Sequence, residues 1–230
     1  MINIDKERFL YHCKDQEFVQ KIIDDFHKLW YYSSAVGGTW KNSFWMGIPI
    51  QKNPMDSMIY QELIYNIRPD YIIETGTKVE GSALFFASIC DMINNGSVIT
   101  IDISKDIELP KHGRITYLTG NSISFEIVDF LSQRILDKNK KVMVVLDSDH
   151  SKEHVLKELE IYSKFISVGS YLVVEDTNCS GHPVIGIKGE GPMEAVQEFL
   201  KMNNNFIIDR NCEKFYLTSN PKGWLKRTKN

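Results

Sequence analysis

The sequence lacks the features that mark several large classes of protein. It holds 4 cysteines in 230 residues and no CxxC pair, which argues against a disulfide framework or a zinc ribbon. Positive charge is not in excess, since 27 Lys and Arg stand against 30 Asp and Glu, so we expect no nucleic-acid partner. The longest apolar runs, such as 142–146, are far shorter than the ~20 residues of a membrane span. The N-terminus is charged where a secretory signal is apolar, and we therefore expect a cytoplasmic protein.

What is present is the composition of a soluble globular chain, 43% hydrophobic and 25% charged. We divide it into an N-terminal segment, 1–54, and a main domain, 55–230. Apolar residues at steps of three and four predict a helix within 1–35, and its apolar stripe contains Phe18, Ile22, Phe26 and Leu29. The glycines and prolines of 33–54 argue against regular structure, and Trp40 and Trp45 there are predicted to pack on a core or to line a pocket.

From residue 58 onward, short apolar runs alternate with helical patterns, which predicts a doubly wound α/β domain with a mostly parallel, seven-stranded sheet. The last two predicted strands are joined by a short connection and are expected to form an antiparallel hairpin at the sheet edge. The predicted strands are 71–74, 98–102, 114–118, 142–146, 170–175, 205–209 and 214–218. The predicted helices are 56–67, 81–94, 122–134, 151–165 and 191–202.

Ligands of such sheets bind at the carboxyl ends of the strands, so the residues that follow each strand indicate the site. Gly76 follows the first strand, where a glycine lets the backbone approach a ligand. Asp102 ends the second strand and is placed to accept hydrogen bonds from both hydroxyls of a ribose. The alternative for Asp102 is a helix cap or a solvated turn, so the pair predicts a nucleotide-type cofactor more strongly than either residue alone.

Three acids follow the fourth and fifth strands, namely Asp147, Glu175 and Asp176. If these strands are neighbours, the three carboxylates converge and need a cation, because their mutual repulsion would otherwise protonate one of them. Oxygen ligands favour Mg²⁺, Mn²⁺ or Ca²⁺ over zinc. The alternative is that some of these acids only cap the following helices. His150 lies on the same loop as Asp147, and a neutral imidazole there is suited to removing a proton near pH 7.

A competing motif is H-x-x-E-H, which His150 and His154 satisfy. It is typical of a class of zinc proteases and would make the protein a metallohydrolase. That chemistry requires both histidines on one helical face, whereas His150 is predicted to precede its helix. We therefore rank the hydrolase hypothesis low.

Five sequence stretches together resemble the cephalosporin hydroxylase/rhamnosyl O-methyltransferase family, which has the Rossmann-like fold of S-adenosylmethionine (SAM) methyltransferases. The match runs from about Gly38 to Arg227, and the chain is more distantly similar to catechol and macrolide-sugar O-methyltransferases. The stretches are ETGT (74–77), GSALF (81–85), LDSDHS (146–151), GSYLVVEDT (169–177) and NPKGWLKR (220–227).

The resemblance implies that the protein is a metal-dependent O-methyltransferase with SAM and Mg²⁺ (or Mn²⁺) as cofactors. Asp102 would hold the ribose, Ser122 would lie by the adenine, and His150 would be the general base. Asp147, Glu175 and Asp176 match the metal ligands, and Asp147 would also line the cofactor site. The residues expected at the methionine end of SAM are Ser57, Glu74, Gly76, Thr77 and Ser82.

The resemblance also implies a small hydroxylated acceptor, most simply a sugar, selected by residues 33–54 and by a glycine-rich loop at 181–192. Family members tend to be oligomeric, so we expect a homo-oligomer in which the apolar stripe of 1–35 packs on its own domain or on a second subunit. One departure is Glu80, where the family has glycine and where a carboxylate would repel that of SAM. Glu80 favours the alternative of a catalytically silent binding or scaffold protein.

Overall fold

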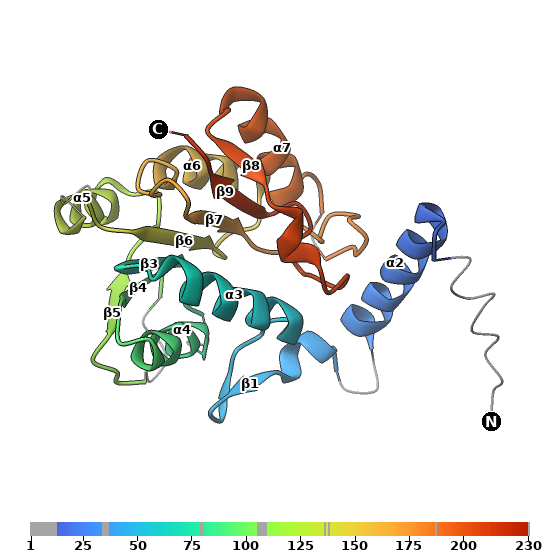
Figure 1. Cartoon of the computed structure of the whole chain (residues 1–230), viewed down its shortest axis with the longest axis horizontal. Helices are drawn as coiled ribbons and strands as arrows, with labels where there is room; N and C mark the ends of the chain where they lie inside the picture. The colour runs from blue at the N-terminus through green and yellow to red at the C-terminus, as the bar shows by residue number, and fades with distance from the viewer. Residues whose placement is uncertain are drawn as a thin grey trace.

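A seven-stranded sheet organises the computed structural model of the protein, with helices on both faces (Figure 1). The strand order is β5-β4-β3-β6-β7-β9-β8. The chain order reverses between β3 and β6, which is the point where doubly wound sheets bind ligands. The structure describes residues 13–33, 37–78, 81–104, 110–135, 137, 139–186 and 188–229.

The elements alternate along the chain as the sequence patterns predict. The strands of the large sheet are β3 (Tyr71–Thr75), β4 (Ser97–Asp102), β5 (Ile115–Thr119), β6 (Val142–Leu146), β7 (Tyr171–Val174), β8 (Phe206–Ile208) and β9 (Trp224–Arg227). The helices are α2 (Gln16–Tyr32), α3 (Pro54–Ile67), α4 (Gly81–Met92), α5 (Phe125–Arg134), α6 (Lys152–Tyr162) and α7 (Pro192–Met202), with the 3-10 turns η2 (Thr39–Asn42) and η3 (Arg210–Glu213).

Two hydrophobic cores hold the layers together, one on each face of the sheet. Successive side chains of a strand point to opposite faces, so Ile72 packs with α3 and α4 while Ile73 packs with α5, α6 and α7. Both residues are fully buried. The predicted α/β fold with a mostly parallel sheet is confirmed, because β5, β4, β3, β6 and β7 pair in parallel.

The predicted last strand, 214–218, is wrong. The connection before it forms η3, where the Asp209 carboxylate accepts a hydrogen bond from the Asn211 N–H, and residues 214–218 continue as a turn in which Tyr216 adopts a left-handed backbone with φ of 68°. The strand is β9, which inserts between β7 and β8 and pairs antiparallel with both, so β8 rather than the last strand forms the edge. Trp224 of β9 is fully buried, whereas Tyr216 is 67% exposed. Burial of the larger indole therefore decides which segment joins the sheet.

Residues 37–53 contain more structure than predicted. A short antiparallel pair, β1 (Phe44–Trp45) and β2 (Ile48–Pro49), packs on α4. The Trp45 ring lies edge-on to Phe85 at 5.0 Å, and its Nε1–H donates to Ser88 Oγ at 3.2 Å. Trp45 thus belongs to the core, which is one of the two roles predicted for it. The division of the chain at residue 54 stays a prediction.

Helix α2 lies at one side of the domain (Figure 1), and hydrogen bonds join it to the loop that follows β7. His27 is 3% exposed, and its Nε2 accepts a hydrogen bond of 2.8 Å from Asn178 Nδ2. The Ile185 N–H donates to the Tyr32 hydroxyl oxygen. The outer part of the predicted apolar stripe stays open, with Phe26 47% and Leu29 66% exposed. Among the described helices, none combines the length and the apolar character needed to cross a membrane.

We expect acid to loosen α2. Burial lowers the pKa of His27 to about 4 in the folded protein, below its ordinary value of 6.5, and Asp24 only partly opposes this effect. A histidine held neutral by burial stabilises the docked helix fully above pH 6.5, and that contribution is lost as the pH falls from 6.5 towards 4. Hydrogen exchange of the α2 amides should therefore accelerate over this range relative to those of β6. A His27→Gln variant should lose the pH dependence, and an unchanged profile would contradict the assignment.

Candidate active site

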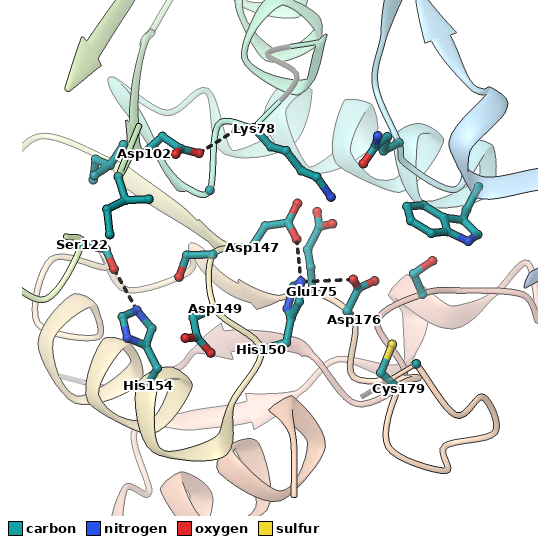
Figure 2. A pocket seen from close by; sticks show the side chains of 18 of the residues that line it. Lys78, Asp102, Ser122, Asp147, Asp149, His150, His154, Glu175, Asp176 and Cys179 are labelled. Carbon is teal, nitrogen blue, oxygen red and sulfur yellow. Dashed lines mark hydrogen bonds and ion pairs between the residues drawn. The ribbon is translucent and has the colours of Figure 1, made fainter. Parts of the chain in front are cut away.

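A pocket of about 700 Å³ opens at the carboxyl ends of the parallel strands (Figure 2). Its size is in the range of cofactor and substrate sites. Seven of the residues predicted for the site line it, namely Gly76, Asp102, Ser122, Asp147, His150, Glu175 and Asp176. The other four, Ser57, Glu74, Thr77 and Ser82, are not among the described residues that line it.

Gly76 makes the turn after β3 that brings β3 and β6 together at the pocket. Its φ is +86°, and a Cβ atom there would lie 1.9 Å from the carbonyl oxygen of Asp147. The glycine is therefore required by the close approach of two backbone segments, in addition to any approach of a ligand.

Glu74 and Thr77 lie beneath this turn rather than in the pocket. The Thr100 hydroxyl donates to Glu74 Oε2 at 2.8 Å and lies 2.6 Å from the Thr77 hydroxyl. Burial raises the pKa of Glu74, while Lys52 and the hydroxyls of Ser82 and Thr100 lower it. These side chains fix the shape of the turn. Their predicted contacts with SAM stay predictions.

Asp102 ends β4 and reaches the rim of the pocket. Its Oδ2 accepts from the Lys78 N–H at 2.8 Å and its Oδ1 from the Ser104 N–H at 3.0 Å, so two backbone groups orient the carboxylate. The side chain of Lys78 extends across the pocket, and its Nζ lies 6.0 Å from the centre of the Trp40 ring. Glu80, the departure from the family pattern, lies outside the described residues.

Ser122 lies on the adjoining wall, close to His154 of α6. The Ser122 hydroxyl is 3.1 Å from His154 Nε2, and the same nitrogen is 3.5 Å from a carboxylate oxygen of buried Glu158. Hydrogen bonding to Glu158 raises the pKa of His154. His150 precedes α6, which begins at Lys152, so the two histidines do not share a helical face. This arrangement speaks against the metallohydrolase alternative.

Asp147, His150 and Asp176 converge because β6 and β7 are neighbours, as the sequence analysis required. Each offers a ligand atom within 4.8 Å of the others. His150 Nε2 lies 3.4 Å from Asp176 Oδ2 and 3.9 Å from Asp147 Oδ1 (Figure 2). Asp176 has a φ of 55°, which is rare for a residue other than glycine and is found in functional sites. The Asp176 N–H donates to Asn220 Oδ1, so the NPKGWLKR stretch holds this turn.

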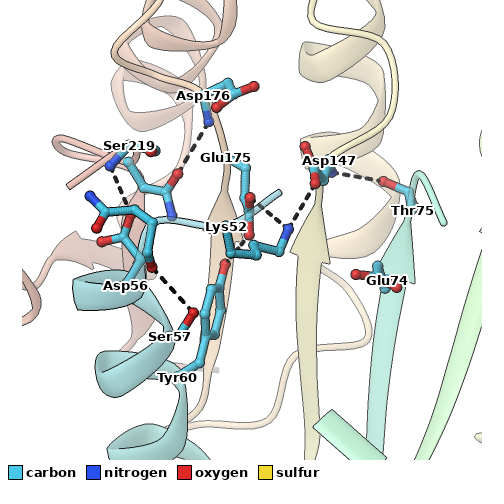
Figure 3. A network of polar contacts seen from close by, with 12 residues as sticks. Lys52, Asp56, Ser57, Tyr60, Glu74, Thr75, Asp147, Glu175, Asp176 and Ser219 are labelled. Atoms are coloured by element: carbon cyan, nitrogen blue, oxygen red, sulfur yellow. Dashed lines mark hydrogen bonds and ion pairs between the residues drawn. The ribbon is translucent and has the colours of Figure 1, made fainter. Parts of the chain in front are cut away.

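Glu175 lies deeper, and its carboxylate is engaged by two residues that the sequence analysis missed (Figure 3). Lys52 Nζ is 2.7 Å from Glu175 Oε2 and 2.8 Å from Asp147 Oδ2. The Tyr60 hydroxyl donates to Glu175 Oε1 at 2.6 Å. Lys52 and Asp147 are 95 positions apart in the sequence, so no local sequence pattern predicts that they pair.

The predicted Ser57 lies on α3, where its hydroxyl donates to the Asn53 carbonyl at 3.2 Å. The neighbouring Asp56 is buried and accepts from the Ser219 N–H at 2.7 Å. Burial raises the pKa of Asp56 to about 7. This part of α3 supports the loop that carries Asn220 and so acts on the pocket indirectly. A contact between Ser57 and SAM stays a prediction.

Aromatic side chains form the wall of the pocket beyond Asp176, and two of them, Trp30 and Tyr31, come from α2. Trp40 of η2 completes the wall and stacks on Tyr31, with ring centres 5.9 Å apart and planes 20° from parallel. Of the two tryptophans predicted to face a pocket or a core, Trp40 faces the pocket and Trp45 the core. Neither Trp30 nor Tyr31 was predicted as a site residue, because the apolar pattern of 1–35 indicates only an appended helix.

A comparison with protein families explains this combination of residues. The sequence profile described as Rhamnosyl O-methyltransferase/CmcI matches residues 38–228. The chain belongs to this family. The resemblance stated from the sequence is thereby confirmed, and with it the predicted enzyme class, an O-methyltransferase.

Curated relatives agree with this assignment. A rhamnosyl O-methyltransferase of Mycobacterium bovis (strain BCG / Pasteur 1173P2) is 35% identical over 212 residues, which cover 90% of this chain and 85% of the relative. A rhamnosyl O-methyltransferase of Mycobacterium leprae (strain TN) is 36% identical over 181 residues, 77% of each chain.

Solved structures show the same fold at lower identity. A CmcI structure whose name includes Mg-SAM has a TM-score of 0.63 and 18% identity, with 82% of this chain and 78% of that chain covered. The O-methyltransferase TomG of Streptomyces achromogenes, in complex with SAM, has a TM-score of 0.54 and 13% identity, with 90% of each chain covered. These likenesses confirm the predicted methyltransferase fold.

Proposed function

We propose that the protein transfers a methyl group from SAM to a hydroxyl of a sugar, with the help of a divalent cation. The observation that carries the proposal is the pocket itself. It has a ribose-type carboxylate, Asp102, on one strand end and the Asp147/His150/Asp176 group on two others. A cofactor and an acceptor bound in such a pocket would meet at the latter group.

The pocket suits SAM on chemical grounds. The backbone N–H groups of Lys78 and Ser104 hold Asp102 at the rim, where its carboxylate can accept further hydrogen bonds from ribose hydroxyls. Ser122 lines the adjoining wall, as expected for a residue beside the adenine. Gly76 leaves room above the turn for the methionine end, and the ordered network of Glu74, Thr77 and Thr100 keeps that turn in shape.

The donors at the other end suit a hard divalent cation. Carboxylate oxygens are the ligands that Mg²⁺ and Mn²⁺ prefer, and Asp147 and Asp176 present them to the pocket, with Glu175 as the third carboxylate. A bound cation would lower the pKa of the acceptor hydroxyl. His150 Nε2 accepts the proton of that hydroxyl, and Asp176, 3.4 Å away, stabilises the resulting imidazolium. SAM, when bound, would supply the methyl group, its carbon–sulfur bond breaking as the acceptor oxygen bonds to the methyl carbon.

The aromatic wall supports a sugar acceptor. Trp40 and Tyr31 present ring faces at the end of the pocket near Asp176, and the apolar face of a pyranose packs well on such rings. The relatives named rhamnosyl O-methyltransferase make a deoxyhexose the first acceptor to test.

The exposed apolar face of α2 supports the predicted homo-oligomer, and a cytoplasmic location also stays part of the proposal.

Calorimetric titration with SAM tests the cofactor half of the proposal. We expect wild-type protein to bind SAM with micromolar affinity and Asp102→Ala to bind at least tenfold more weakly, because ribose hydrogen bonds to a carboxylate are lost. Asp91→Ala, whose carboxylate pairs with Arg114 away from the pocket, is the matched control. Absence of SAM binding up to millimolar concentration would contradict the proposal and favour the silent binding protein suggested by Glu80.

Trp40 and Trp45 allow a matched test of the acceptor wall. We expect Trp40→Ala to raise the KM for a sugar acceptor at least fivefold and to leave SAM affinity unchanged, since its ring faces the acceptor end. Trp45→Ala should instead lower the Tm, because it removes a core ring packed on Phe85. Steady-state kinetics and thermal unfolding separate the two effects. An unchanged acceptor KM in Trp40→Ala would place the acceptor elsewhere.

A further inference from the structure

Lys52 places a buried positive charge directly beneath the carboxylates of the site (Figure 3). It comes from the loop between β2 and α3, and its side chain is only 3% exposed. Its Nζ bridges Asp147 Oδ2 at 2.8 Å and Glu175 Oε2 at 2.7 Å. Two carboxylate oxygens within 2.8 Å of Nζ stabilise the charged form, so the side chain is an ammonium ion.

Because of this bridge, the two carboxylate oxygens of Asp147 face different partners. Oδ2 is bonded to Lys52, while Oδ1 is the oxygen that lies 3.9 Å from His150. The carboxylate of Glu175 is fixed at both ends, by Lys52 at Oε2 and by the Tyr60 hydroxyl at Oε1. Lys52 therefore determines which carboxylate oxygens are free to face the pocket.

The charges explain why such a residue is needed. Asp147, Glu175 and Asp176 lie close together, and burying like charges without a counter-ion is strongly unfavourable. An ammonium ion between two of them compensates that repulsion in the absence of any metal. The same ammonium repels a divalent cation that approaches the pocket side of Asp147, and the low polarity of the surroundings strengthens that repulsion.

We propose that Lys52 is a positioning residue, an internal cation that keeps the carboxylate cluster formed without metal and weakens the binding of the divalent cation. The proposal rests on the cation site of the proposed function. It predicts a site that is folded in the metal-free protein and exchanges its cation readily. A chain without the ammonium would use the divalent cation as a structural ion.

The test compares Mn²⁺ binding and thermal unfolding in wild-type protein and Lys52→Met. We expect the variant to bind Mn²⁺ at least tenfold more tightly by calorimetry. Its Tm should fall in EDTA and recover when Mn²⁺ is added, whereas the Tm of the wild type should change little with Mn²⁺. Lys140→Met, which removes a surface ion pair with Asp70, should bind Mn²⁺ like the wild type.

Lys52→Gln is the second variant, in case Lys52→Met does not fold. It removes the positive charge but keeps an amide that can donate hydrogen bonds to Asp147 and Glu175, so it should fold and bind Mn²⁺ more tightly than wild type. Equal or weaker Mn²⁺ binding in the folded variants, with wild-type binding intact, would overturn the role of Lys52 alone. Absence of Mn²⁺ binding in the wild type and in both variants would overturn this role together with the cation site of the proposed function.

Discussion

Replacement of His150 by glutamine is expected to lower kcat by about 10²–10⁴-fold, which is the usual contribution of a general base. The loop between β6 and α6 holds His150 at the pocket, with Nε2 3.4 Å from Asp176 Oδ2, and the base is proposed on this geometry. Glutamine keeps a polar side chain of similar reach but has no nitrogen that accepts a proton near neutral pH.

The same variant should bind SAM and Mn²⁺ with an affinity close to that of the wild type, because the cofactor half of the pocket and both aspartates are untouched. His112→Gln is the matched control, since His112 pairs with Asp91 at a distance of 3.0 Å, away from the pocket. Retention of more than a third of kcat in His150→Gln would exclude His150 as the base. Loss of Mn²⁺ binding would instead identify it as a ligand.

Replacement of Gly76 by alanine is expected to cost roughly 3 kcal/mol or more of stability, in the range of severe backbone and packing defects. The added Cβ would lie 1.9 Å from the Asp147 carbonyl oxygen, so β3 and β6 must separate at the pocket. The positive φ of +86° adds the ordinary penalty of a left-handed alanine.

Gly169→Ala separates these two effects. Gly169 has nearly the same φ, +85°, but nothing lies within 4 Å of its added Cβ. It should therefore show only the conformational penalty, about 1–2 kcal/mol. Urea unfolding measures both variants, and SAM titration should show a loss of affinity in Gly76→Ala alone. Equal loss of stability in the two variants would mean that the contact with Asp147 relaxes at no cost.

The parallel core and the edge that carries the site could be predicted because both have local signals. Buried parallel strands are continuous apolar runs, so β6 was predicted with its observed bounds, and the acids that follow β6 and β7 meet because those strands are neighbours. The strand predicted at 214–218 is wrong because its apolar pattern does not show that a later segment, with the fully buried Trp224, occupies that place in the sheet. Tertiary packing, rather than local strand propensity, decides which of the two segments forms the strand.

The residues that were missed depend on contacts between distant parts of the chain. Lys52 is in a loop without regular structure, and only the fold brings it 2.8 Å from Asp147. Trp30 and Tyr31 line the pocket because His27 and Tyr32 dock α2 beside the loop after β7. Ser57 and Glu74 were assigned by resemblance alone; neither is among the described residues that line the pocket, and their contacts with SAM stay predictions.

The measurement that tests the central claim most directly is methyl transfer itself. Purified protein is incubated with isotopically labelled SAM, Mg²⁺ and a rhamnosyl glycoside, and the product is analysed by mass spectrometry, with EDTA and His150→Gln as controls. The account predicts one labelled methyl group on a sugar hydroxyl, lost in EDTA, restored by Mg²⁺ and strongly reduced in the variant. SAM binding without any labelled product, across rhamnosyl and other sugar acceptors and with either Mg²⁺ or Mn²⁺, would contradict it.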